Sequence, residues 1–358
     1  MTAERTHMTR EEVLEAIRAN RTVKNADLKG LDLKGADLHL GRFHGCCLDG
    51  ARFAGIRLEK TGFKDCTFKG AVFDGCSFTD MLLRRMDFSG ASFLKAYFLR
   101  CHCSGSSFAG ADFEGAKVHW TFLDKTSLAG ARFHKAGFLK SVCLEADCSG
   151  ADFHGAHLER VTFRKANMDG SLLRGAEFDH VNLSAAKLAG HDFSGQKLRS
   201  VNFSGADLAG ADFSGADVST CVFQGATLTG AKLMQITAQK CMFSEAKLDG
   251  SRGSEGDFGM SYFGAADLSR SDFRKARFRG ARFEKAKILD AAFMDSDCYN
   301  CDMSHADLSG SDFSRANLFL ACVHGVKDEK TRFDGANTLY LRKPDADMAA
   351  AEGFQAPA

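Results

Sequence analysis

Proline is almost absent from this chain of 358 residues, which contains only two, Pro344 and Pro357. Both lie close to the C-terminal end of the sequence. Because proline has no backbone N–H to donate, it is excluded from the interior of paired β-structure. Its absence from all the preceding residues is therefore compatible with a long run of continuous backbone pairing.

Net charge is also close to zero, with 47 Lys and Arg against 46 Asp and Glu. A protein that binds nucleic acid through bulk charge is expected to be basic, so this balance disfavours a nucleic-acid partner. No apolar run is long enough to span a bilayer, and residues 1–25 lack the apolar segment of a signal peptide. These absences predict no membrane insertion and a cytoplasmic location.

What the sequence does contain is a period of five residues, clearest in 206–217, which reads ADLAG ADFSG AD. From Leu28 to Val323 a central position recurs every fifth residue, giving 60 successive units without an insertion or deletion. Of these 60 centres 28 are Phe and 20 are Leu, and the residue two places earlier is Ala in 30 units. A five-residue period fits neither a helix nor an alternating strand, so both positions are predicted to face the interior of a repeat architecture.

This pattern resembles the pentapeptide-repeat family, whose consensus is Ala, then Asp or Asn, then Leu or Phe, then two variable residues. The resemblance implies an all-β fold, a right-handed quadrilateral β-helix of about 15 coils, in which four pentapeptides complete one coil of about twenty residues. Each coil buries little by itself, so stability is expected to come from stacking on its neighbours. Only Ala238 and Gly253 fill the central position weakly. We therefore expect a distorted coil, a bulge or a bend within 236–265.

The ends of the chain depart from the repeat and define four predicted segments. Thr9 and Glu12 have the spacing of a capping box, and the apolar residues after them predict a short helix that covers the open end of the β-helix. A partner-binding helix is the alternative interpretation. The predicted segments are residues 1–25 as a polar segment and capping helix, 26–325 as the β-helix, 326–342 as a C-terminal cap and 343–358 as a flexible tail.

Thirteen cysteines raise the question of disulfides or zinc. Eleven fall on the two inward positions, which favours their use as small buried apolar side chains. Cys101, Cys103, His102 and His119 come nearest to a metal-ligand set, but both cysteines are predicted to point inward. We find no P-loop, nucleophile elbow, HExxH or paired CxxC motif. The sequence thus predicts a non-enzyme without a metal, a cofactor or a small-molecule substrate.

Function is therefore expected on the outer surface. Most outward positions of the repeat are polar, but one region departs from this pattern. Apolar side chains gather at outward positions between residues 81 and 145, and basic residues border them. Trp120, the only tryptophan, belongs to this set. The composition is that of a protein contact. The predicted contact comprises Leu82, Tyr97, Leu99, Trp120, Phe122, Leu139, Val142 and Leu144, with Arg84, Arg85, Arg100, Lys125 and Lys140 at its border.

Three interpretations of this surface remain open: a protein partner, a homodimer contact, or internal cover by another part of the chain. A smaller set near the C-terminal end, Tyr299, Phe319 and Leu320, is assigned to end capping or self-association.

The favoured function is a rigid bacterial scaffold for protein–protein interaction. One alternative is an accessory or adaptor of type VI secretion, which rests on an opening sequence similar to that of pentapeptide-repeat proteins from such loci. The other is the DNA-mimicking, gyrase-interacting role of some family members. The neutral net charge disfavours this second alternative, although Asp207, Asp212 and Asp217 form a short acidic run.

Overall fold

The computed structural model describes residues 5–342, so the predicted tail at 343–358 lies outside the described residues. The chain divides into two compact units, Met1–Lys187 and Leu188–Ala358.

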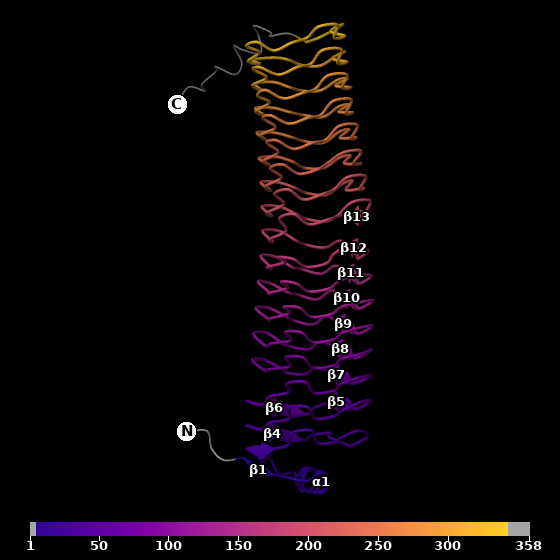
Figure 1. Ribbon diagram of the computed structural model, residues 1–358, viewed down its shortest axis with the longest axis vertical. Helices are drawn as coiled ribbons and strands as arrows, with labels where there is room; N and C mark the ends of the chain where they lie inside the picture. The colour runs from indigo at the N-terminus through magenta and orange to yellow at the C-terminus, as the bar shows by residue number, and fades with distance from the viewer. Residues whose placement is uncertain (1–4, 343–358) are drawn as a thin grey trace, which may run out of the picture. The chain divides into compact units, whose positions relative to one another are not determined.

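The first unit contains one helix and a series of short parallel strands (Figure 1). The helix is α1 (Arg10–Arg18). Strands β5, β7, β8, β9, β10, β11 and β12 succeed one another in one sheet, β2, β4 and β6 form another, and β1 pairs with β3. Their bounds are β1 (Thr6–His7), β2 (Val23–Lys24), β3 (Ala26–Asp27), β4 (Arg42–His44), β5 (Arg57–Glu59), β6 (Gly62–Lys64), β7 (Ser77–Thr79), β8 (Tyr97–Leu99), β9 (Lys117–His119), β10 (Gly137–Leu139), β11 (His157–Glu159) and β12 (Glu177–Asp179).

Pairing joins residues that are twenty apart, as in the register Tyr97↔Lys117 between β8 and β9. The five-residue period arises from a turn at each corner of the coil. The amide of Ala96 donates to the carbonyl of Phe93 at 3.0 Å, and Lys95 between them has a φ of 55°. Because positive φ favours glycine, glycine is frequent at this corner position along the chain.

The acidic residue of the repeat has a local structural role. In the unit around Asp112, the carboxylate Oδ1 accepts a hydrogen bond of 3.0 Å from the amide of Glu114, two residues later. The same arrangement joins Asp87 to Ser89 at 3.0 Å. Asp and Asn form such turns readily, which explains why either residue precedes the central Leu or Phe.

The core consists of columns of stacked rings. Phe93 is fully buried and stacks on Phe73 and Phe113, with ring centroids 5.1 Å and 4.8 Å away. The alanines two places before the centres are buried beside these rings, as at Ala91 and Ala111. Both inward positions of the predicted pattern therefore form the interior.

The fold class is confirmed as a parallel β-solenoid. The sequence predicted about 15 coils. The coils that carry a strand number roughly 10, fewer than this prediction. The last strand is β13 (Leu198–Arg199), in the second unit. Beyond it, up to residue 342, each side of a coil is joined to the next by a single bridged residue.

Helix α1 begins as the sequence predicts. The amide of Glu12 donates to Oγ1 of Thr9 at 3.3 Å, and the amide of Thr9 donates to the Glu12 carboxylate at 2.7 Å, which completes a capping box. Val13 and Ala16 are buried on its inner face. The amphipathic helix thus covers apolar surface next to the first strands.

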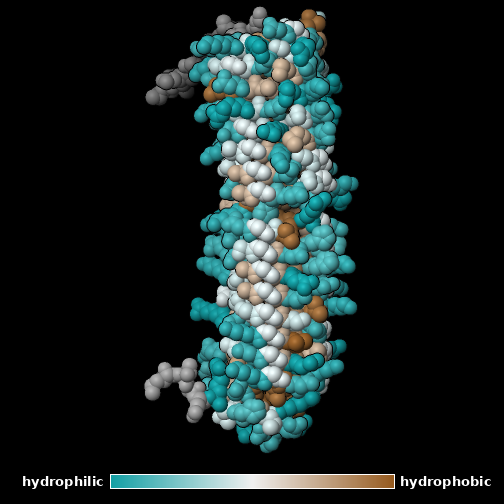
Figure 2. All heavy atoms as spheres, in the orientation of Figure 1, coloured by the Kyte–Doolittle hydropathy of each residue, from teal (hydrophilic) through white to brown (hydrophobic). Residues whose placement is uncertain are grey.

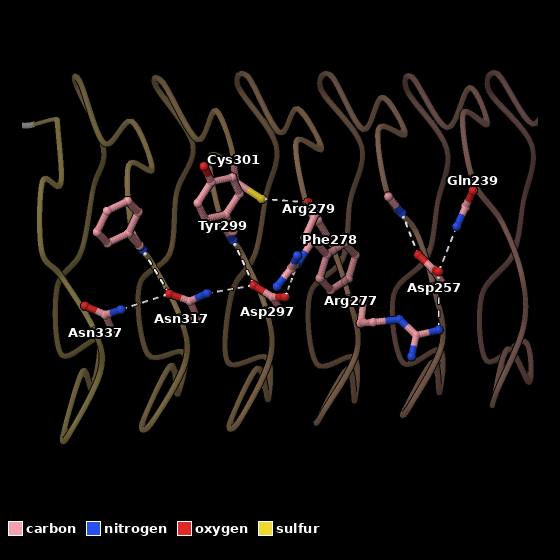
Figure 3. Close-up of polar contacts among 12 residues, drawn as sticks. Gln239, Asp257, Arg277, Phe278, Arg279, Asp297, Tyr299, Cys301, Asn317 and Asn337 are labelled. Carbon is pink, nitrogen blue, oxygen red and sulfur yellow. Dashed lines mark hydrogen bonds and ion pairs between the residues drawn. The ribbon is translucent and has the colours of Figure 1, made fainter.

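Ladders of hydrogen-bonded polar side chains run along one side of the coils on the outer face of the second unit (Figure 3). Asn337 donates to Asn317 at 3.1 Å, and Asn317 donates to Asp297 at 2.9 Å. One coil earlier on the same side, Arg277 donates to Asp257 at 3.2 Å. Opposite charges and amides twenty residues apart therefore support the coil register.

The distortion expected within 236–265 is not present, so that prediction is wrong. Lys232 pairs with Arg252 and Asp257 with Arg277, in the same twenty-residue register as elsewhere. A Cβ atom placed on Gly253 would lie 2.2 Å from Cε1 of Phe273. The ring of Phe273 therefore fills the space that a side chain at position 253 would occupy, and the backbone keeps the regular twenty-residue register.

The C-terminal end of the second unit is only partly covered by its described residues. Phe333 stacks on Phe313 with ring centroids 5.8 Å apart but is half-buried, as is Val323. Tyr340 is exposed. Tyr299, Phe319 and Tyr340 form a run of rings on the side of these coils.

Candidate functional site

The predicted contact surface lies wholly within the first unit, on two adjacent sides of the coils and the corner between them. One side carries β8, β9 and β10, with the column Leu99, His119 and Leu139. Trp120 occupies the corner directly after β9. On the next side, parallel bridges join Leu82, His102, Phe122 and Val142 in order. We call Leu82, Tyr97, Leu99, Trp120, Phe122, Leu139, Val142 and Leu144 the Trp120 patch.

Three members of the Trp120 patch are exposed: Leu82 at 66%, Trp120 at 48% and Phe122 at 39%. The other members are half-buried. The face drawn in Figure 2 is mainly hydrophilic, with scattered hydrophobic side chains, which is the ordinary background for such a surface. A cluster that combines exposed Trp, Phe and Leu departs from that background.

Histidines lie between the apolar members, a feature that the sequence analysis did not include. His102 stacks on Phe122 with ring centroids 4.8 Å apart, and His119 meets the edge of Tyr97 at 5.3 Å. Burial, together with Lys117 nearby, lowers the pKa of His119. The imidazoles therefore extend the aromatic surface, and the lowered pKa favours the neutral form of His119.

Trp120 occupies a corner position of the coil, where the backbone turns. Its φ is 55°, in the left-handed region that glycine adopts without strain. Nζ of Lys140 lies 4.2 Å from the centroid of the Trp120 ring, in a cation–π contact. The indole is thereby presented at the corner with one of the predicted border residues above it.

The basic border is neutralised in part by ion pairs within the chain. Arg100 pairs with Asp80 at 2.7 Å, and Lys125 pairs with Glu145 at 3.7 Å. Within the described residues, no ion pair is found for Arg84 or Arg85. Both arginines are exposed, so the uncompensated positive charge lies beside Leu82.

Eight copies of the motif described as pentapeptide repeats match residues 23–55, 66–101, 87–128, 143–179, 176–215, 202–237, 261–297 and 296–327, which together span more than half of the chain. The chain belongs to the pentapeptide-repeat family. No curated protein matches it.

Several solved pentapeptide-repeat structures are similar to it. HetL, a pentapeptide-repeat protein involved in the regulation of heterocyst differentiation in the cyanobacterium Nostoc sp. strain PCC 7120, is 20% identical over 72% of this chain and 87% of its own, with a TM-score of 0.26. Full-length QnrB1, a plasmid-mediated fluoroquinolone resistance protein, is 16% identical over 71% and 93%, with a TM-score of 0.22. A protein from the thylakoid lumen of Arabidopsis thaliana is 30% identical over 24% and 59%, with a TM-score of 0.23.

The residues considered for zinc do not converge in this pentapeptide-repeat chain. The thiol of Cys101 donates to the buried carbonyl of Phe78 at 3.4 Å, whereas His102 lies outside against Phe122. Among residues 5–342 no group of three His, Cys, Asp or Glu side chains could hold a metal ion. Nor does any helix in that range have the length and apolar character needed to cross a bilayer. All thirteen cysteines are buried free thiols.

Other exposed apolar residues escaped the sequence analysis. Leu172 lies on another side of the first unit, and Met242 and Met260 lie in the second unit near Tyr262. Leu172, Met242 and Met260 all occupy outward positions of the repeat. Trp120 was identified by assigning inward and outward positions within the five-residue unit. The same assignment could have identified these residues.

Asp124 lies beside the Trp120 patch, and its half-buried carboxyl provides a test of how burial changes stability with pH. Burial raises the pKa of its carboxyl, against the effect of the hydrogen bond of 3.2 Å that Oδ1 accepts from the amide of Leu144. With a folded pKa above the unfolded one, the contribution of this group to stability is present at low pH and is lost as the pH rises through the folded pKa. We expect Asp124→Asn, which keeps the acceptor oxygen, to raise the free energy of unfolding at pH 7 but not at pH 3, as measured by urea denaturation.

Asp80→Asn is the matched control, because its shift has the opposite sign. The hydrogen bond from Arg100 lowers the pKa of Asp80, so its contribution is present above the unfolded pKa and is lost as the pH falls through the folded one. This variant should lose stability at pH 7. Equal effects of the two substitutions would contradict the assigned directions.

Proposed function

We propose that this protein is a non-enzymatic scaffold that binds a different protein through the Trp120 patch. The observation that carries the proposal is the exposure of Trp120, Phe122 and Leu82 on neighbouring columns of a single unit. Tryptophan and other aromatic residues are enriched where protein contacts contribute most binding energy. The coils that stack on these residues hold the backbone in a regular geometry. Little backbone conformational entropy is therefore lost when a partner binds.

The charges indicate what kind of partner fits. Arg84 and Arg85 are exposed and lie on the side of the coil that carries Leu82. Arg100 and Lys125 are already matched by acidic residues within the chain. The partner surface is therefore proposed to be apolar in its centre and acidic along the edge that meets the two free arginines.

Trp120→Gly provides a test that leaves the fold intact. Glycine accepts a φ of 55° without strain, whereas an ordinary residue there costs about 1–2 kcal/mol. The substitution thus relieves the backbone while it removes the indole. We expect partner binding to weaken at least about tenfold, in the range of interface hot spots, with the thermal midpoint unchanged or raised.

Leu172→Ser is the matched control, since Leu172 is 57% exposed in the same unit but lies outside the Trp120 patch. The wild type and both variants would be used as baits in cross-linking pull-downs and examined by size exclusion with light scattering. Loss of one captured protein with Trp120→Gly alone, from an unchanged oligomer, is the expected result. A dimer that Trp120→Gly converts to monomer would replace the proposal by self-association. Identical capture by all three proteins would contradict a role of the Trp120 patch in binding.

The two alternative functions have less support from the described residues. A DNA-mimicking role needs a continuous acidic face, but Asp212 of the acidic run pairs with Lys232 at 3.2 Å. A role in type VI secretion rests on the similarity of the opening sequence alone. Both remain hypotheses beside the proposal of a scaffold.

A further inference from the structure

One side of the Trp120 patch is a straight column of outward side chains, which we call the Leu82 column. Parallel bridges join its members, each one coil further along the first unit, in the order Leu82, His102, Phe122 and Val142. Beyond Val142 the next bridged residue is the polar Thr162. Coils about 4.8 Å apart place the first and last members about 14 Å from each other. The column is therefore long enough to contact several side chains of one partner segment.

This side of the coils offers a partner side chains but no backbone hydrogen bonds. The amide of Phe122 donates to the carbonyl of Cys101 at 2.9 Å, and the carbonyl of Phe122 accepts from the amide of Cys103 at 2.8 Å. The amide of Val142 donates to the carbonyl of Thr121 at 2.9 Å. Because these groups are paired between coils, a partner strand has no free edge to extend here. A partner segment must therefore satisfy its own backbone groups, as an α-helix does internally.

Two exposed arginines stand at opposite ends of this side. Arg84 and Arg164 are eighty residues and therefore four coils apart, each two positions after the line of bridged residues. That separation is about 19 Å. Among residues 5–342 neither arginine takes part in an ion pair. Glu145 does not compensate Arg164, because it already pairs with Lys125 at 3.7 Å and Lys165 at 3.9 Å. Uncompensated positive charge therefore lies at both ends of the Leu82 column.

We propose that the partner segment is an amphipathic α-helix that lies along the Leu82 column and carries acidic residues in its first and last turns. This inference rests on the proposed function of the Trp120 patch as a contact with a different protein. It adds the secondary structure, the direction and the charge pattern of the segment that binds there. The acidic residues would meet Arg84 at one end and Arg164 at the other.

The spacing of the column favours a helix over an extended segment. A helix rises about 5.4 Å per turn, close to the coil spacing of about 4.8 Å, so one apolar residue per turn meets one member of the column per coil. Apolar residues at i, i+4, i+7 and i+11 span about 16 Å, against about 14 Å for the column. An extended strand places the side chains of one face about 6.7 Å apart and falls out of register after a single coil.

Trp120 provides a direct signal for occupation of the column. It stands at the corner that precedes Phe122 and is 48% exposed. It is also the only tryptophan of the chain. A helix on the Leu82 column would remove water from the indole and shift its fluorescence emission to shorter wavelength. The emission of the full chain therefore reports on this surface alone.

The test is a fluorescence titration of the full chain with synthetic amidated peptides that lack aromatic residues. The probe is a helix of Ala and Gln, about 16 residues long, with Leu at i, i+4, i+7 and i+11 and Glu in its first and last turns. In a second peptide Lys replaces Glu, a third has Pro in its central turn, and a fourth alternates Leu and Thr between the same Glu residues. The first peptide should give a saturable shift, with an affinity at least about tenfold higher than that of the other three.

The double variant Arg84→Ser/Arg164→Ser tests the two ends of the column and retains Trp120 as the signal. It should bind the Glu-containing helix at least about tenfold more weakly than the wild type and lose most of the salt dependence of that binding. Arg52→Ser is the matched control, because Arg52 is an exposed arginine on another side of the same unit. Circular dichroism of each variant would confirm that the fold is retained.

Three outcomes would overturn the proposal: tighter binding of the alternating peptide, equal binding of the Glu and Lys helices, or no shift with any peptide up to about 1 mM. None of them decides the proposed function, because the pull-down with Trp120→Gly tests a protein contact of any shape. A failure of the proposed function would instead appear as identical capture in that pull-down.

Discussion

Replacing Phe93 by Ala should lower the free energy of unfolding of the first unit by about 3–5 kcal/mol, the largest effect expected from any single substitution considered for this chain. Phe93 is fully buried and stacks on Phe73 and Phe113. The coils above and below are fixed by their own backbone pairing, so they cannot collapse into the space that the ring leaves. The cost therefore includes the cavity as well as the lost apolar burial. Urea denaturation of the wild type and the variant measures it.

Phe122→Ala is the control for this prediction, because it removes the same ring from the outer surface of the same unit. Phe122 is 39% exposed and contacts His102. Its removal should change the free energy of unfolding by no more than about 0.5–1 kcal/mol. If both variants lost equal stability, the stacked interior column could not be the main source of stability in this unit.

Much of the solenoid could be predicted from the sequence, because its rules are local. The repeat places each side chain either inside or outside, and Phe93 and Trp120 illustrate the two outcomes. The capping box at Thr9 was also predictable, since its two hydrogen bonds depend on residues three apart. Position in a five-residue unit is thus sufficient to assign the layers of the fold.

What could not be predicted depends on how side chains on neighbouring coils orient towards one another. The sequence places Arg100 and Asp80 in one column, but their direct pairing, which neutralises part of the predicted basic border, depends on the rotamers of both side chains. The same limit applies to Lys140 above Trp120. The candidate site was therefore predictable as a set of residues, whereas its electrostatic character needed coordinates.

Gly253 shows the same limit in the core, and it yields the second large effect. Counting residues identifies an empty central position there, whereas the structure places Cε1 of Phe273 2.2 Å from where a Cβ would be. We expect Gly253→Ala to destabilise the second unit by about 1–3 kcal/mol, as overpacking does, when measured by urea denaturation. The φ of Gly253 lies outside the left-handed region, so the cost is steric.

Gly250→Ala separates this steric cost from backbone strain. Gly250 has a φ of +66°, and no atom lies within 4 Å of its added Cβ, so its penalty of about 1–2 kcal/mol comes from the backbone alone. Shortening the opposing ring in Gly253→Ala/Phe273→Leu should then restore part of the stability lost by Gly253→Ala, whereas Phe273→Leu should not rescue Gly250→Ala. Strict additivity in both double variants would mean that the Phe273 ring does not occupy the space beside Gly253. A positive coupling confined to the Gly253 pair would instead show that a residue twenty positions away supplies the core that this pentapeptide lacks.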